Sequence, residues 1–123
     1  KPIMNPPNQY LGIWIFISFV LQGIFAFKIL EKFIRDKYLL LIFSCFFVIS
    51  PMFLHRLSLG HSAMFAHWLI LASMFLYFSN YKNFYMWSLI IIISMLVNSY
   101  IATMVLLVFI LFFLNNFRVF TAW

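Results

Sequence analysis

Long apolar stretches dominate this chain and limit most strongly what it can fold into. Residues 10–30 contain no charged side chain before Lys28. A helix of about 20 apolar residues crosses the hydrocarbon core of a bilayer, which is about 30 Å thick. Of the 123 residues, 67% are hydrophobic and 8% are charged, whereas about 25% of an ordinary soluble domain is charged. The sequence therefore predicts an all-α integral membrane protein, a polytopic transmembrane helical bundle with four to five membrane helices.

Polar interruptions set the limits of the predicted spans. The apolar stretch of residues 84–114 would form a helix about 46 Å long, too long for one untilted crossing. We expect it to break at its only polar cluster, Asn98, Ser99 and Tyr100, although one tilted helix with a buried Asn is the alternative. The five predicted spans of this single domain are residues 10–30, 38–54, 63–81, 84–97 and 101–115.

Basic residues predict the direction of the spans. The net charge is +6, and Lys and Arg in short connectors favour the cytoplasmic side. Four of them lie in connector 28–37, whereas connector 55–62 contains only Arg56. We therefore expect connector 28–37 to be cytoplasmic and connector 55–62 to be extracytoplasmic. In a membrane chain such a surplus points to lipid headgroups as partners and is no evidence for nucleic-acid binding.

The second connector and the start of the third predicted span hold the main candidates for chemistry. His55, Arg56, His61 and His67 are the only concentration of ionisable residues outside the basic connector. Arg can pair with phosphate, although contact with lipid headgroups is the favoured interpretation of His55 and Arg56. The three histidines recur every six residues, which on a helix separates neighbours by about 240°. With no acidic residue beside them, we predict no metal site, and a divalent metal would require ligands outside this fragment.

Three polar positions lie inside the predicted spans. His67 falls near the start of the third span, where it either serves function or hydrogen-bonds a neighbouring helix. Gln22 lies mid-span near Ser18, Gly23 and Ala26, a pattern typical of a helix-packing face, with a substrate-lining role as the alternative. Residues 98–100 form either a structural helix break or the lining of a cavity.

The acidic residues provide no catalytic base. Glu31 and Asp36 are the only carboxylates, and both lie among the basic residues of connector 28–37. They are most simply local charge partners. The chain starts at Lys1 and ends at Trp123 without a polar tail, so we expect it to be a fragment of a longer protein. The catalytic residues are unknown.

Several short segments together resemble a known group of proteins. The segments are Asn8 to Trp14, Phe19 to Gly23, Ser50 with Pro51, Arg56, Gly60 with His61, and Ala66 to Leu71. This pattern is similar to a family of uncharacterised bacterial polytopic membrane proteins, which in turn resembles the GT-C glycosyltransferases. The resemblance covers most of the chain, from Asn8 to about Leu114.

The resemblance implies a portion of a larger GT-C-like membrane domain in the bacterial inner membrane. Such enzymes transfer a sugar from a polyprenyl-phosphate donor at the extracytoplasmic face. Arg56 would then contact the lipid phosphate, His61 the donor phosphate or acceptor, and His67 with Gln22 would shape the cavity. The acidic residue that GT-C enzymes usually carry in their first large outer loop has no match here. A transporter or lipid flippase segment, or a non-catalytic membrane scaffold, is the alternative, and no cofactor is evident.

Overall fold

The chain is helical throughout the part that the structure describes. The computed structural model describes residues 6–49 and 65–120, and it describes the side chains of residues 10–49 and 65–116. Within these ranges 84% of the residues are helical and there are no strands, which confirms the predicted all-α class. The helices are α1 (Pro6–Leu30), α2 (Lys37–Val48), α4 (Trp68–Phe78), α5 (Phe84–Val97) and α6 (Ser99–Phe120).

Two of these helices could span a membrane. They contain the apolar segments Tyr10–Leu30 in α1 and Ser99–Asn116 in α6, and only 17% of the best window in each is buried within the protein. At 1.5 Å per residue, α1 is about 38 Å long and α6 about 33 Å. The described parts of α2, α4 and α5 have 12, 11 and 14 residues, so they extend only about 17–21 Å.

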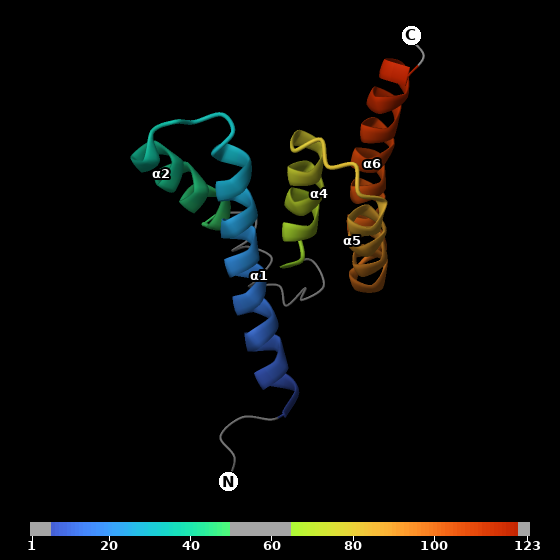
Figure 1. Cartoon of the computed structure of the whole chain (residues 1–123). Coiled ribbons are helices and arrows are strands. Elements are labelled where there is room, and N and C mark those ends of the chain that lie inside the picture. The colour runs from blue at the N-terminus through green and yellow to red at the C-terminus, as the bar shows by residue number, and fades with distance from the viewer. Residues whose placement is uncertain (1–5, 50–64, 121–123) are drawn as a thin grey trace. The chain divides into compact units, whose positions relative to one another are not determined.

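The helices form two compact units, Lys1–Trp68 and Leu69–Trp123. In the first unit α2 turns back along α1 (Figure 1). Asp36 begins α2 as its N-cap, because its carboxylate accepts a hydrogen bond of 3.0 Å from the backbone N–H of Tyr38. This side chain therefore has a capping role besides the local charge pairing expected from the sequence. A carboxylate at this position satisfies an N–H that the helix leaves unpaired.

The contacts between α1 and α2 show that the two helices are antiparallel. A Cβ added to Gly23 would lie 3.3 Å from Val48 Cγ2, so the two backbones are close at this level. One turn later on α1, Phe27 shares the lining of a pocket with Leu41, which lies earlier on α2. The buried side of α1 consists of Ser18, Gln22, Ala26 and Ile29. The predicted small and polar stripe is therefore buried.

In the second unit, α4 ends in a left-handed turn at Asn80, whose φ is 49°. The N–H of Tyr81 donates to Leu76 O, and the N–H of Asn80 donates to Tyr77 O, each at 3.0 Å. This pair of bonds is a Schellman motif, which uses carbonyl groups left unpaired by the end of a helix. Asn83 then caps α5 by accepting from the N–H of Tyr85 at 3.0 Å.

A single residue separates α5 from α6. Asn98 is extended, with φ −164° and ψ 129°, and its N–H donates to Ser94 O at the end of α5. Its side chain accepts from the N–H of Tyr100, and its carbonyl accepts from the N–H of Ala102. Asn98 therefore ends one helix and begins the next. The 84–114 stretch forms two helices, and the one-helix alternative is not observed.

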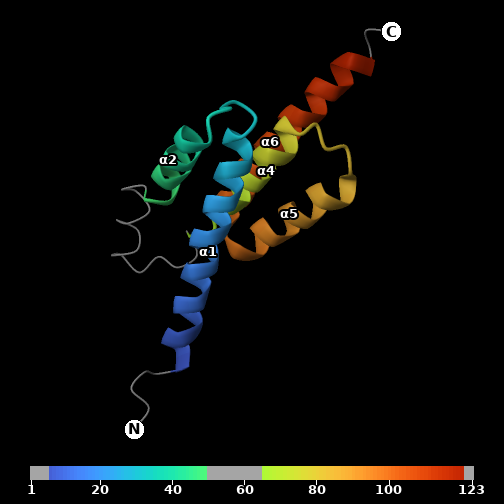
Figure 2. The same ribbon diagram turned by 60° about the vertical axis from the view of Figure 1, so that its left-hand side comes forward.

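The two helices that meet at Asn98 fold back on each other (Figure 2). Trp87 of α5 is 1% exposed, and its ring centroid lies 5.3 Å from that of Phe109 and 5.0 Å from that of Phe112. Its indole N–H donates to Tyr81 O at 3.0 Å. Tyr77 of α4 also contacts Phe112, with centroids 6.4 Å apart. This aromatic cluster forms the core of the second unit.

Several helix boundaries differ from those predicted: α2 ends at Val48 instead of residue 54, and α6 covers Ser99–Phe120 instead of residues 101–115. α1 begins at Pro6 instead of near residue 10, because proline is compatible with a first helical turn, where backbone N–H groups have no partner within the helix. α4 begins at Trp68, so His67 lies in the turn before the helix and not within it. α4 ends at Phe78, before the predicted end at residue 81. At the Trp68 boundary the hydropathy pattern gives little signal, because the apolar residues Ala66 and Leu69 lie on either side of it.

Candidate functional site

The most unusual polar contact of the first unit is made by Gln22. Its amide Nε2 donates a hydrogen bond of 2.7 Å to the carbonyl of Phe47. Phe47 lies in the last turn of α2, where carbonyl groups have no partner within the helix. Gln22 is only 6% exposed. The side chain therefore satisfies the end of α2 at a place where water has little access.

The other half of the same amide has no partner. Gln22 Oε1 and Ser18 Oγ are buried, and neither forms a hydrogen bond within the part of the chain that the structure describes. The two residues are four apart and so lie on the same face of α1. Leaving a buried polar atom unpaired costs about 1–3 kcal/mol. Both atoms could therefore form hydrogen bonds with a further polar group.

Ser18 differs from the other buried serines of the described ranges. The hydroxyls of Ser44, Ser73 and Ser94 each donate to the carbonyl three residues earlier, at 2.7–2.8 Å. That local bond is the usual way for a helical serine to satisfy its hydroxyl in an apolar environment. Ser18 is 0% exposed and does not form it. Its hydroxyl therefore differs from those of the other buried serines in making no bond among the described residues.

A third unpartnered polar atom lies on the same side of α1. Trp68 Nε1 is buried without a hydrogen-bond partner among the described residues. The Trp68 ring stacks on Phe25, with centroids 6.3 Å apart and planes 10° apart. Phe25 is seven residues after Ser18, which is about two helical turns along the same face. We call Ser18 and Gln22 of α1, together with Trp68 at the start of α4, which stacks on Phe25, the polar face of α1.

The chemistry available to the polar face is hydrogen bonding. It offers an amide oxygen that accepts, an indole N–H that donates, and a hydroxyl that does both. Such groups suit the hydroxyls of a neutral polar ligand or the backbone of another segment. No three His, Cys, Asp or Glu side chains come together within the described ranges.

The sequence candidates fall into three sets. His55, Arg56 and His61 lie outside the described residues. His67 is half-buried immediately before Trp68, and it takes part in an interaction within the structure. Asn98 is half-buried, whereas Ser99 and Tyr100 are exposed. The hydrogen bonds of Asn98 cap both the end of α5 and the start of α6.

Sequence reasoning did not select Ser18 or Trp68 as site residues. Ser18 enters the sequence analysis only as a residue near Gln22, and Trp68 is not a candidate there. The spacing of Ser18 and Gln22 carried the available signal, since residues four apart share a helix face. For Trp68 no local signal exists, because its position depends on contact with Phe25, which is distant in the sequence.

Comparison with known proteins assigns the chain to a family. Residues 1–121 match DUF6311, described as a domain of unknown function. The chain belongs to the DUF6311 family. No curated protein and no solved structure matches it. In this DUF6311 chain the polar face of α1 is the candidate site that the described side chains support.

Proposed function

We propose that this DUF6311 chain is a segment of a multi-spanning domain of the bacterial inner membrane. The exposed surface of α1 is the observation that carries this proposal. Ile13, Phe16, Ile17 and Val20 are 44–70% exposed, and their spacing of three and four residues places them on one long face of the helix. An exposed apolar face of this length is normally covered by protein or lipid.

The domain containing this segment transfers a sugar from a polyprenyl-phosphate donor at the extracytoplasmic face. The resemblance of the residue pattern to GT-C glycosyltransferases supports this activity. The basic connector supports the orientation, because the turn between α1 and α2 contains Lys32 and Arg35 and would lie at the cytoplasmic end of α1. Arg56 and His61 would contact the donor phosphate, and Gln22 with His67 would shape the cavity.

The test follows a labelled donor. Membranes containing the full-length protein are incubated with a panel of polyprenyl-phosphate-linked radiolabelled sugars, and consumption of the donor is measured. We expect Arg56→Ala and His61→Ala to reduce donor consumption about 100-fold, because charge-assisted contacts to phosphate would be lost. Lys82→Ala is the control, since Lys82 is exposed in the turn before α5. Full activity in both variants would contradict the phosphate-binding roles.

A transporter or lipid flippase is the second candidate, and the end of α2 favours it. Val48 lies beside Gly23, about 10 Å along α1 from Leu30. If α1 spans a bilayer, this helix end lies within the hydrocarbon, where irregular backbone normally lines a cavity or is buried in protein. Movement of the labelled lipid across proteoliposomes without consumption of its sugar would support transport over transfer.

A further inference from the structure

A groove runs along one side of the hairpin formed by α1 and α2. It consists of two pockets, of about 400 and about 440 Å³, that share Phe27 and Leu41. The first pocket lies at the connector, and the second extends along the helices as far as Gly23 and Val48. We call the two pockets together the hairpin groove.

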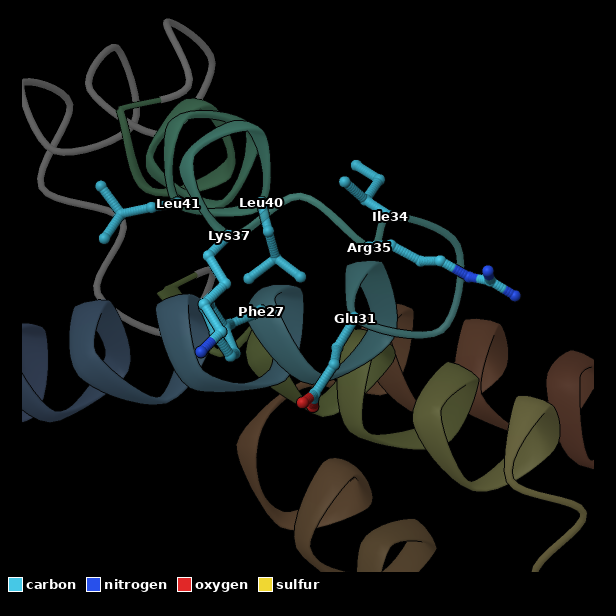
Figure 3. Close-up of a pocket in the computed structure, with 7 residues that line it drawn as sticks. All are labelled: Phe27, Glu31, Ile34, Arg35, Lys37, Leu40 and Leu41. Atoms are coloured by element: carbon cyan, nitrogen blue, oxygen red, sulfur yellow. The ribbon is translucent and has the colours of Figure 1, made fainter.

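The lining of the hairpin groove changes in character along its length. Three charged side chains, Glu31, Arg35 and Lys37, line the pocket at the connector (Figure 3). The second pocket is largely apolar, with Ile24, Leu41 and Val48 in its wall and Lys28 beside them. One end is therefore charged, and the other is suited to hydrocarbon.

The charges of the groove favour an anion. Its lining includes the cations Lys28, Arg35 and Lys37 and the single carboxylate Glu31. In Figure 3 the Lys37 side chain extends toward α1 beside Phe27, whereas Arg35 points away from both helices and Glu31 extends away from α2. The ammonium of Lys37 thus lies where the charged and apolar parts of the groove meet. Long, exposed Arg35 can turn toward an anion bound there.

The charged and apolar ends of the groove match the headgroup and the acyl chains of a membrane lipid in position. The candidate span Tyr10–Leu30 ends at the connector, so the charged pocket would lie at the interface of a bilayer. Gly23 would lie about 10 Å deeper. Basic pockets at the cytoplasmic surface bind the headgroups of anionic lipids, and hydrocarbon chains fill apolar grooves because burial removes their surface from water.

We propose that the hairpin groove binds one anionic phospholipid, with its phosphate at Lys37 and Arg35 and one acyl chain along Leu41, Cys45 and Val48. This inference rests on the membrane insertion proposed above but not on sugar transfer. The groove lies at the end of α1 opposite to the predicted extracytoplasmic connector. Its lipid is therefore distinct from the polyprenyl-phosphate donor.

The test uses native mass spectrometry of the full chain purified from membranes in detergent. Phosphatidylglycerol and phosphatidylcholine with the same acyl chains are added separately. We expect one phosphatidylglycerol to remain bound at collision energies that release phosphatidylcholine. Replacement of both Arg35→Gln and Lys37→Gln should weaken retention at least about tenfold, because charge-assisted bonds to phosphate are lost. Equal retention of both lipids would overturn the proposal.

A control variant that removes the same number of positive charges distinguishes a specific lipid site from general electrostatic attraction of anionic lipid to the protein. Lys32→Gln with Lys82→Gln also removes two positive charges, but neither residue lines the groove. This variant should retain the lipid as the unchanged protein does. Equal loss in both double variants would show diffuse electrostatic attraction and would overturn the site.

The apolar half of the groove has a test of its own. Cys45 is exposed and lines the second pocket, so Cys45→Trp fills that pocket without changing charge. We expect loss of the retained lipid while helicity by circular dichroism is unchanged, and Cys45→Ser serves as the control. Retention in Cys45→Trp, or equal competition by soluble glycerol phosphate, would overturn acyl-chain binding. Sugar transfer is assayed separately, so its failure would leave this result standing.

Discussion

At the scale of single residues, buried side chains differ in whether their polar atoms form hydrogen bonds that stabilise the fold or have no partner among the described residues. Gln22 belongs to both groups, because its Nε2 satisfies Phe47 O while its Oε1 stays unpaired. Ser18 belongs only to the second. Because of this difference, we expect substitution of Gln22 to lower the stability of the protein and substitution of Ser18 not to lower it.

Gln22→Leu should destabilise the α1–α2 hairpin. The change removes the donor to Phe47 O and leaves that carbonyl without its side-chain partner at a partly buried position, which costs about 1–2 kcal/mol. Reversible unfolding in detergent, followed by circular dichroism, measures the change in free energy. Ser18→Ala is the matched control and should leave stability unchanged or raise it by up to about 1 kcal/mol, since it removes a buried hydroxyl that makes no bond among the described residues. Equal effects of both changes would contradict this account.

Asn80 should tolerate glycine and reject branched residues. Its φ of 49° lies in the left-handed region, which asparagine and glycine adopt most readily. Asn80→Gly should keep the stability of the protein within about 0.5 kcal/mol, whereas Asn80→Val should cost about 1–2 kcal/mol. The same unfolding measurement tests both. A stable Asn80→Val variant would show that the turn can change shape without cost.

At the scale of helices, one backbone position decides the course of the last third of the chain. Residues 84–97 and 99–120 are both apolar helical segments. Their composition alone would allow them to join into one continuous helix. The extended conformation of Asn98 and its three hydrogen bonds separate them. The aromatic contacts of Trp87 with Phe109 and Phe112 then stabilise the folded-back arrangement.

Asn98→Ala should move the equilibrium toward one continuous helix. Alanine cannot cap α6, which costs about 0.5–2 kcal/mol, and it is the strongest helix former. Spin labels at Met86 and Ile110, both about half exposed, report the result in a Cys45→Ser background. A continuous helix would separate these positions by about 36 Å along its axis. Asn98→Ser retains a capping oxygen and should keep the short distances of the unchanged protein.

At the scale of the whole molecule, the main expectation concerns the two sides of the membrane. The sequence predicts that connector 28–37 is cytoplasmic and connector 55–62 extracytoplasmic. The described structure supports a turn at the first of these, closed by the N-cap of Asp36. The second lies in residues outside the described ranges.

Single cysteines test this sidedness. In a Cys45→Ser background, Lys32→Cys and Ser58→Cys are treated with a membrane-impermeant maleimide in intact spheroplasts. We expect the cysteine at position 58 to react at once and the one at position 32 only after the membrane is permeabilised, because basic connectors stay in the cytoplasm. The opposite pattern would invert the topology and remove the proposed site at the outer face.

Sequence alone determined the helical class, the first candidate span and the division of the chain at its polar clusters. Each depends on local properties: unbroken apolar runs, capping side chains and the helix break at Asn98. The helix boundaries at Pro6 and Trp68 escaped prediction. Apolar residues flank the Trp68 boundary, and prolines are compatible with a first helical turn.

Tertiary structure alone decided which polar atoms stay unpaired and which surfaces form a groove. Nothing local to Gln22 indicates that its amide caps a helix 25 residues away, nor that the hydroxyl of Ser18 lacks the bond formed by Ser44. The hairpin groove likewise exists only because α2 turns back along α1. The physical reason is that hydrogen-bond partners and shared surfaces depend on contacts between distant residues, whereas helix formation depends on neighbours in the sequence.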